Sequence, residues 1–310
     1  MLQLLAAHDC WVFDLDGTLW RGSELIDGVV EALQLLLRLG KQVLYLTNNS
    51  MHSRARYAQK CAALGLPASE ASIYSSSYSA ALYLDSIGFD RTKKVYVVGE
   101  RGIMDELAAV GIDCFGGPDD NERRVSFAAE MAHDPQVGAV VCGVDPGLNY
   151  YKVQYASLCI LNNPGCLFIA TNSDARGHFT PRTEWAGAGA TVGAIKAVVE
   201  REPVLTGKPS TFTFDAIART HGVAADRAII VGDRLDTDIA WGHAAGLTTL
   251  LVLTGVTDAE LLAAQHAGGD GSDGGGRRLC RPHHALASFG DLRLVAAEAE
   301  RRLGAAQQLN

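Results

Sequence analysis

The sequence predicts an α/β fold: a doubly wound, parallel-sheet, Rossmann-like core with a smaller α/β domain inserted into it. The chain has 310 residues, which is longer than a typical single domain. Short apolar runs alternate with segments of helical periodicity, as in the βαβ units of a parallel sheet. Several of these runs end in polar residues, and open α/β sheets bind their ligands at the carboxyl ends of the strands.

Seven apolar runs are predicted as strands: 11–13, 43–46, 95–98, 139–142, 167–170, 229–231 and 250–253. Between the first two runs, apolar residues recur at helical spacing at Val29, Leu33, Leu36 and Leu37. Gly40 follows them and predicts the end of this helix, because glycine readily adopts the left-handed conformation found there. The first unit is therefore strand, helix, strand.

The polar residues at the predicted strand ends are Asp14, Thr47, Ser75, Asp233 and Thr254. They flank a middle stretch, 84–187, that contains three apolar runs of its own. We therefore expect a core domain, with the polar strand ends, formed by residues 1–83 and 188–310. Residues 84–187 are predicted to form the inserted α/β domain.

Composition excludes several classes of protein. A hydrophobic content of 48% and a charged content of 20% are those of a globular chain with a large core. The net charge of -8 gives no attraction to nucleic acid, and no apolar run is long enough to span a membrane. The seven cysteines form no C-x-x-C pair, which disfavours a zinc site. The Gly- and Asp-rich segment 268–276 has no strand before it and is predicted as a surface loop.

The first chemical motif is Asp14-Leu15-Asp16-Gly17-Thr18, directly after the run 11–13. Two carboxylates two residues apart turn toward one point only where the chain leaves the sheet. Asp14 could then attack a phosphorus atom, while Asp16 donates a proton to the leaving oxygen and later accepts one from water. A surface turn with solvated acids is the alternative, and the other motifs decide between the two interpretations.

The second motif is Thr47-Asn48-Asn49-Ser50, which follows the run 43–46. A hydroxyl group and successive backbone N–H groups at the start of a helix form a socket for a phosphoryl dianion. A simple helix N-cap is the alternative, and the two interpretations are compatible.

The third motif is Thr206-Gly207-Lys208-Pro209-Ser210. Its lysine could neutralise the nucleophile and the phosphoryl oxygens. A P-loop is excluded, because Glu202 stands where that pattern has glycine and Pro209 stands where it has serine or threonine.

The fourth motif, 231–238, contributes Asp233 and Asp238. Together with Asp14 and Asp16 these residues would gather too much negative charge without a cation. Carboxylates and a substrate phosphate oxygen are the ligands that Mg²⁺ prefers. The sequence therefore predicts a magnesium site.

In this order, DLDGT, LTNNS, GKPS and GDRLDTD resemble the four motifs of the haloacid dehalogenase superfamily of phosphatases. The resemblance implies that Asp14 is the nucleophile, Asp16 the acid and base, and Lys208 the residue that stabilises the phosphoryl group. Phosphoryl binding is implied for Thr47, Asn48 and Asn49. The implied ligands of Mg²⁺ are the Asp14 carboxylate, the Asp16 backbone carbonyl and the Asp233 carboxylate, with Asp238 as a further ligand or a partner of one.

The insertion is similar to the α/β cap, which supplies specificity, of the subgroup containing nitrophenyl-phosphate, pyridoxal-phosphate and phosphoglycolate phosphatases. Strings such as KKVYVVGERGI, LNYYKVQYASLCI and NPGCLFIATNSDA resemble those of the plant and algal phosphoglycolate phosphatases. That resemblance implies 2-phosphoglycolate as the small phosphorylated substrate, a homodimer and a location in the chloroplast stroma. Without it, the bare chain would be interpreted as cytoplasmic.

A substrate that carries a carboxylate needs a positive or N–H donor in the cap. Arg176, His178 and Arg182 follow the run 167–170 and are the candidates, although loop residues of this kind are often simply solvated. His178 is favoured by its position in the substrate loop of related phosphatases.

The motifs bear on three rival functions. A phosphatase of broader specificity, acting on pyridoxal phosphate or nitrophenyl phosphate, has the same four motifs. A carbon–halogen hydrolase on this fold has little use for Asp16 or a metal. A non-catalytic relative would be expected to lack one of the motif residues, and none is missing.

Overall fold

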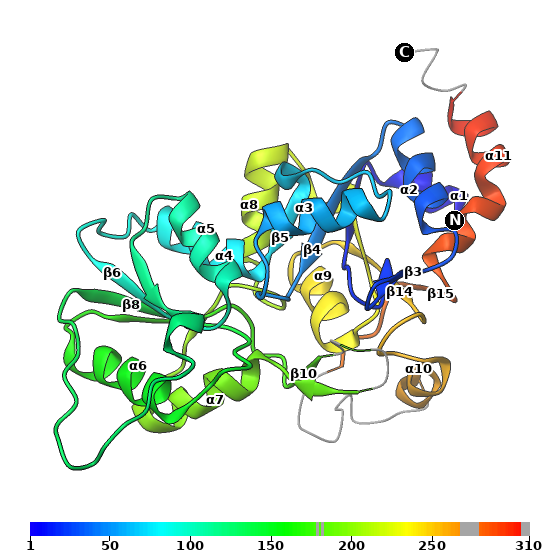
Figure 1. The fold of residues 1–310 in the computed structure, drawn as a ribbon. Helices are drawn as coiled ribbons and strands as arrows, with labels where there is room; N and C mark the ends of the chain where they lie inside the picture. Colours follow the sequence, from blue (N-terminus) through cyan, green and yellow to red (C-terminus); the bar gives the residue numbers. More distant parts are fainter. Residues whose placement is uncertain (178–179, 181–182, 267–278, 305–310) are drawn as a thin grey trace. The chain divides into compact units, whose positions relative to one another are not determined.

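The chain forms two compact units (Figure 1). The first contains residues 1–46, 58–73 and 208–310, and the second contains residues 47–57 and 74–207. The structure, a computed structural model, describes residues 1–177, 180, 183–266 and 279–304. His178, Arg182 and the 268–276 segment therefore lie outside the described residues.

A six-stranded sheet in the order β15-β14-β13-β1-β4-β5 forms the centre of the first unit. Its strands are β1 (Cys10–Phe13), β4 (Gln42–Thr47), β5 (Ile73–Ser75), β13 (Ala228–Gly232), β14 (Thr248–Val252) and β15 (His284–Leu286). Four of the predicted runs fall on these strands, and the pairing of β1 with both of its neighbours is parallel, as predicted. The strand β1 is buried at every residue, as expected for a central strand covered on both faces.

The order of the strands explains where the polar strand ends lie. From β1 the chain proceeds outward to β4 and β5 on one side, while β13, β14 and β15 extend on the other. This is a topological switch point, where α/β sheets bind ligands. Phe13 pairs in register with Val231, so Asp14 and Asp233 both follow the carboxyl ends of adjacent strands.

The helix predicted after β1 is present as α2 (Val29–Arg38). Val29, Leu33 and Leu36 are fully buried, and Gly40 has the predicted left-handed backbone with φ 67°. Leu37, however, is 43% exposed, so the apolar face of the helix does not include it.

The other elements of the first unit are α1 (Leu2–Ala7), β2 (Trp20–Arg21), β3 (Glu24–Leu25), α3 (Arg54–Ala63), η1 (Glu70–Ser72), α8 (Phe212–His221), η3 (Ala225–Arg227), η4 (Leu235–Ile239), α9 (Ala240–Ala244), α10 (Ala259–His266), η5 (Phe289–Val295), α11 (Ala296–Ala299) and η6 (Glu300–Gly304). The first residues of α3 belong to the second unit.

The second unit contains a five-stranded sheet in the order β12-β9-β8-β6-β7. Its elements are α4 (Ser76–Ser86), β6 (Lys94–Val98), α5 (Arg101–Ala109), β7 (Cys114–Gly116), η2 (Gly117–Asp120), β8 (Val137–Cys142), α6 (Tyr150–Asn162), β9 (Leu167–Ala170), β10 (Arg176–Gly177), β11 (Trp185–Ala186), α7 (Ala188–Val199) and β12 (Val204–Leu205). The three apolar runs predicted in 84–187 are its central strands.

Alternate side chains of β6 point to opposite faces of the sheet and pack into two different hydrophobic cores. Val95 and Val97 face a core that contains residues of α4 and α5, whereas Tyr96 and Val98 face one that contains residues of α6 and α7. Figure 1 shows these two helix pairs on opposite faces of the sheet. The sheet is therefore covered on both faces, as parallel sheets usually are.

The second unit is wider than the predicted insertion 84–187. Ala80 and Ala81 of α4 lie in one core, and Val192 and Ile195 of α7 lie in the other. Strand β12 also pairs with β9 in this sheet. Helical and strand patterns predict the type of an element, but not which of two sheets it packs against.

A buried ion pair lies in the second unit, away from the predicted motifs. The ammonium group of Lys152 is 2.9 and 2.7 Å from the two carboxylate oxygens of Asp145, and it also donates to Asn121 Oδ1 at 2.6 Å. Both side chains of the pair are fully buried. Each buried charge depends on the other for compensation, and the hydrogen bond to Asn121 links the pair to the segment after η2.

All seven cysteines are free, and only Cys114 and Cys280 are partly exposed. Burial raises the pKa of the Cys61 thiol to about 11, so its reactive thiolate form is disfavoured. None of the helices in the described part of the chain is long and apolar enough to cross a membrane.

Candidate active site

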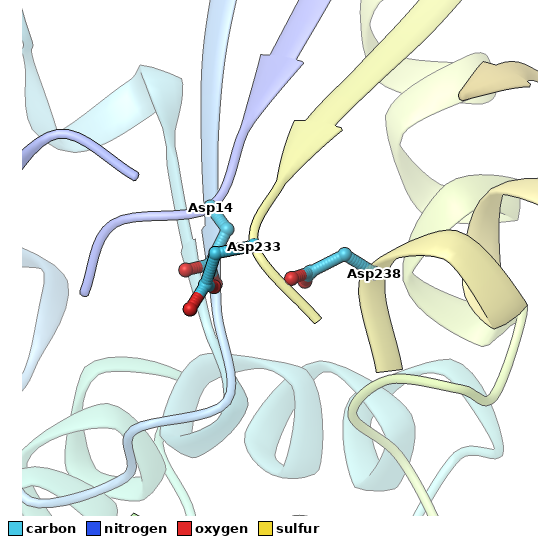
Figure 2. A group of neighbouring side chains, drawn as sticks. All are labelled: Asp14, Asp233 and Asp238. Atoms are coloured by element: carbon cyan, nitrogen blue, oxygen red, sulfur yellow. The ribbon is translucent and has the colours of Figure 1, made fainter. Parts of the chain in front are cut away.

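Three carboxylates converge at the switch point of the first sheet. Asp14 follows β1, Asp233 follows β13, and Asp238 belongs to η4. Figure 2 shows the three side chains pointing toward a common space. One carboxylate oxygen from each lies within 4.8 Å of the others, and all three residues are buried. The structure thus brings together the acidic residues of the first and fourth motifs.

Lys208 lies between two of these carboxylates. Its ammonium nitrogen is 2.5 Å from Asp14 Oδ1 and 2.6 Å from Asp238 Oδ1, and it also donates to the carbonyl of Leu46 at 3.1 Å. The lysine is 1% exposed, so these charge-assisted hydrogen bonds are shielded from water. The lysine of the third motif therefore neutralises only part of the negative charge of the cluster.

The local electrostatics show that negative charge is in excess. Burial raises the pKa of the Asp14 carboxyl well above its usual range, and Asp238 and Asp233 also raise it, although Lys208 opposes them. Burial together with Asp238 raises the pKa of Asp233 to about 7. Burial alone would lower the pKa of the Lys208 ammonium, but Asp14 and Asp238 more than offset this effect. A bound cation would relieve the excess.

The donor set fits a hard divalent cation. Asp233 Oδ2 accepts a hydrogen bond from the Val256 N–H at 2.6 Å, but the buried Oδ1 has no hydrogen-bond partner within the described part of the chain. Buried polar atoms usually have a hydrogen-bond partner, and a carboxylate oxygen without a donor is suited to binding a hard cation. At Gly17 and Gly255 a Cβ atom would lie 2.5 and 1.8 Å from Asp233 Oδ2, so only glycine leaves this carboxylate its space.

The cluster predicts how stability depends on pH and metal. Without a cation, Asp233 retains a proton that the unfolded chain releases above its ordinary pKa of 3.8. Folding stability contributed by this proton is therefore lost as pH rises from about 4 toward the folded pKa of about 7. Because the cation binds the ionised form, magnesium should raise the melting temperature more at about pH 8 than at about pH 5.

Thermal melting of the metal-free and magnesium-saturated protein at both pH values tests this expectation. The Asp233→Asn variant is the control, since it removes both the titrating group and a predicted metal ligand and should melt at nearly the same temperature with and without magnesium. An equal magnesium effect at both pH values in the unaltered chain would contradict it.

Asp16 lies apart from the three-carboxylate group. Its carboxylate is half-buried and accepts a hydrogen bond from the Trp20 indole N–H, with 2.7 Å between Trp20 Nε1 and Asp16 Oδ1. The metal role implied for Asp16 concerns its backbone carbonyl and stays a prediction. Sequence reasoning missed Trp20, although the residue lies only four positions further along the chain.

The phosphate-socket motif belongs to the second unit and differs from the expected helix start. Strand β4 ends at Thr47, but α3 begins only at Arg54. The Asn49 N–H donates to Thr47 Oγ1 at 3.1 Å, and the Met51 N–H donates to Asn49 Oδ1 at 3.0 Å. The prediction of a helix N-terminus at this motif is wrong, because these side chains offer the backbone N–H groups turn partners in place of helical ones.

Asn48 is fixed by side chains from elsewhere in the second unit. Its amide nitrogen is 3.2 Å from each carboxylate oxygen of Asp174, and its carbonyl accepts from Ser76 Oγ at 2.5 Å and from Asn172 Nδ2 at 2.6 Å. Asp174 was not a candidate residue. Its place in the predicted substrate loop after β9 was the only signal in the sequence that pointed to it.

One of the three cap candidates is described. Arg176 pairs with Glu184 across the two-stranded β10–β11 sheet, with 2.6 Å between Nη1 and Oε2. Because both side chains are exposed, the pair contributes little to stability. His178 and Arg182 lie outside the described residues, so their roles remain predictions.

Comparison with known proteins agrees with this geometry. Residues 11–113 match the family model described as haloacid dehalogenase-like hydrolase, and residues 205–271 match a second model of HAD-like hydrolases. The chloroplastic phosphoglycolate phosphatase 1A of Arabidopsis thaliana is 50% identical over 262 residues, which cover 84% of this chain and 72% of that protein.

Two solved structures share the fold. The p-nitrophenyl phosphatase of Archaeoglobus fulgidus is 27% identical with a TM-score of 0.76, and the match covers 93% of this chain and 99% of that one. A glycerol phosphate phosphatase of Mycobacterium tuberculosis, in complex with magnesium, is 29% identical with a TM-score of 0.73. That match covers 93% of this chain and 77% of the other.

Proposed function

The chain belongs to the haloacid dehalogenase-like hydrolases, and from that membership we propose that it hydrolyses 2-phosphoglycolate to glycolate and phosphate through an aspartyl phosphate on Asp14. Identity of 50% to a phosphoglycolate phosphatase over most of the chain supports the reaction and the substrate. The observation that carries the mechanism is the buried contact of Lys208 with Asp14 Oδ1, which fixes the carboxylate that would attack phosphorus.

Asp14, Asp16 and Lys208 each have a proposed role in the reaction. One carboxylate oxygen of Asp14 attacks phosphorus, and the bond from phosphorus to the glycolate oxygen breaks as Asp16 donates a proton to that oxygen. Asp16 then takes a proton from water as the water attacks the aspartyl phosphate, which releases phosphate and restores Asp14. Lys208 holds Asp14 in place and stabilises the negative charge that develops on the phosphoryl oxygens.

A divalent cation completes the site, and magnesium is the ion we propose. Asp14 and Asp233 would hold it through their carboxylates and Asp16 through its backbone carbonyl, with Asp238 as a ligand or a partner of one. When bound, the ion supplies positive charge to the phosphoryl oxygens and allows Asp14 to be ionised despite its burial. The unpartnered oxygen of Asp233 supports this assignment.

The remaining roles are carried over from the resemblance. Thr47, Asn48 and Asn49 would bind the phosphoryl group, and the second unit would act as the specificity cap with His178 facing the substrate. The same resemblance supports a homodimer and a place in the chloroplast stroma.

A broader phosphatase is the second candidate function. It is favoured by the structural likeness to enzymes that act on p-nitrophenyl phosphate and glycerol phosphate. The chemistry at Asp14 would be the same, and only the recognition of the leaving group would differ.

Phosphate release from a panel of esters separates the two. The panel contains 2-phosphoglycolate, glycerol phosphate, pyridoxal phosphate, p-nitrophenyl phosphate and a nucleotide, each with and without magnesium. We expect 2-phosphoglycolate to have a kcat/KM at least about tenfold above the others, the discrimination that a specific pocket contact gives. Similar values for all esters would retain the mechanism and reject the substrate. Full activity after thorough chelation would reject the metal site.

A further inference from the structure

The indole of Trp20 is the direct partner of the Asp16 carboxylate. Trp20 is fully buried, and its Nε1–H donates to Asp16 Oδ1 at 2.7 Å. The backbone supports this contact, because the Gly17 N–H donates to the Trp20 carbonyl at 2.7 Å and Asp16 forms a β-bridge with Trp20. The path of the loop after β1 thus brings the Trp20 indole back to Asp16, near the start of that loop.

Lys60 holds the indole from a second direction. Its ammonium nitrogen lies 4.0 Å from the centre of the Trp20 ring, a favourable cation–π distance, and donates to the Gly22 carbonyl at 3.1 Å. Gly22 lies between the short strands β2 and β3, so Lys60 ties that turn to the ring. The orientation of the indole is therefore set by both the backbone and Lys60.

The chemistry of the indole makes this contact directional. An indole N–H can donate but cannot accept, so Asp16 Oδ1 serves as the acceptor whether or not Asp16 carries a proton. The carbonyl oxygen of a carboxylic acid is a better acceptor than its hydroxyl oxygen. The proton of the acid form is thereby directed to Oδ2.

We propose that Trp20 is a positioning residue that assigns the transferable proton of Asp16 to Oδ2 and fixes the direction in which that oxygen points. The proposal rests on the acid–base role proposed above for Asp16. Proton transfer by a positioned side chain contributes about 10²–10⁴-fold to a rate, and misdirecting the proton forfeits part of that factor.

The test compares leaving groups of different basicity in the full chain with magnesium. Trp20→Phe retains an aromatic ring and removes the N–H. Its kcat/KM should fall about tenfold for 2-phosphoglycolate and phenyl phosphate, whose leaving oxygens need a proton, and by less than about twofold for p-nitrophenyl phosphate, whose leaving oxygen does not. The value of kcat/KM reports the first phosphoryl transfer, in which Asp16 acts as the acid.

Trp11→Phe is the matched control. Trp11 is a fully buried tryptophan of the same unit, and its Nε1 has no hydrogen-bond partner among the residues that the structure describes. The substitution removes the same atoms without touching Asp16, so all three esters should be hydrolysed at nearly the original kcat/KM. A loss in Trp20→Phe that is equal for phenyl and p-nitrophenyl phosphate would indicate a structural role and overturn the proposal.

Two further variants keep the outcomes distinct. Asp16→Asn should show a larger loss with the same dependence on leaving group. If Asp16→Asn shows no such loss, the proposed acid–base role of Asp16 fails. If Asp16→Asn shows the loss and Trp20→Phe does not, only the positioning role of Trp20 fails. Should Trp20→Phe not fold, Lys60→Met leaves the indole in place but less firmly oriented. A loss confined to the poor leaving groups then supports the proposal, and an equal or absent loss overturns it.

Discussion

Asp14→Asn is expected to lower phosphate release from 2-phosphoglycolate by roughly 10³-fold or more, because a carboxamide cannot form the aspartyl phosphate. The substitution conserves size and leaves the fold intact, since the amide still fits between Lys208 and the surrounding strands. Rapid quenching during turnover of labelled substrate should trap a phosphorylated chain in the unaltered protein and none in the variant.

The control for this experiment is Asp105→Asn, an exposed aspartate on α5, which should retain full activity. If Asp14→Asn lost activity but still trapped a phosphoryl group, the nucleophile would be a residue other than Asp14. Full activity in Asp14→Asn would reject the proposed mechanism altogether.

Lys208→Met should reduce both activity and stability. Removing a preorganised cation from developing charge lowers kcat about 10²–10³-fold. Without metal, the variant also leaves Asp14 and Asp238 uncompensated in a buried site, a situation that destabilises proteins by about 3–5 kcal/mol. Burial already raises the pKa of Asp14, so proton uptake by Asp14 would relieve part of this, and the loss of stability should be larger at about pH 8 than at about pH 5.

Lys152→Met is the matched control for the lysine. Its ammonium group is equally buried and also pairs with an aspartate, but in the second unit. The variant should lose comparable stability in denaturant unfolding, while the folded protein retains kcat within about threefold, since the cluster at Asp14 is unchanged. If the two lysine variants lost activity alike, the effect of Lys208 would be one of folding rather than of catalysis.

Much of the fold was predictable from the spacing of apolar residues along the sequence and their need to be buried. All seven apolar runs became strands, because runs of β-branched and other apolar residues between turns have few other ways to be buried. Asp14 and Asp233 could be expected to meet, since both follow strands of one parallel sheet.

Other features depend on how the chain turns, which periodicity does not encode. The contact of Trp20 with Asp16 requires a particular path through the loop after Gly17, where φ is 87°. Likewise, the contact of Asp174 with Asn48 joins residues 126 positions apart. The helix expected at Thr47 failed because local side-chain acceptors satisfied the backbone first.

The boundaries of the second unit limit how the chain can be engineered. A chimera that exchanged only residues 84–187 with a relative would combine foreign strands with the native α4 and α7, whose side chains fill the two cores beside β6. Each mismatched graft would create cavities or overlaps on both faces of the sheet. Exchange of the second unit's sheet between relatives therefore needs crossovers placed before Ser76 and after Leu205, so that both helices are exchanged together with their sheet.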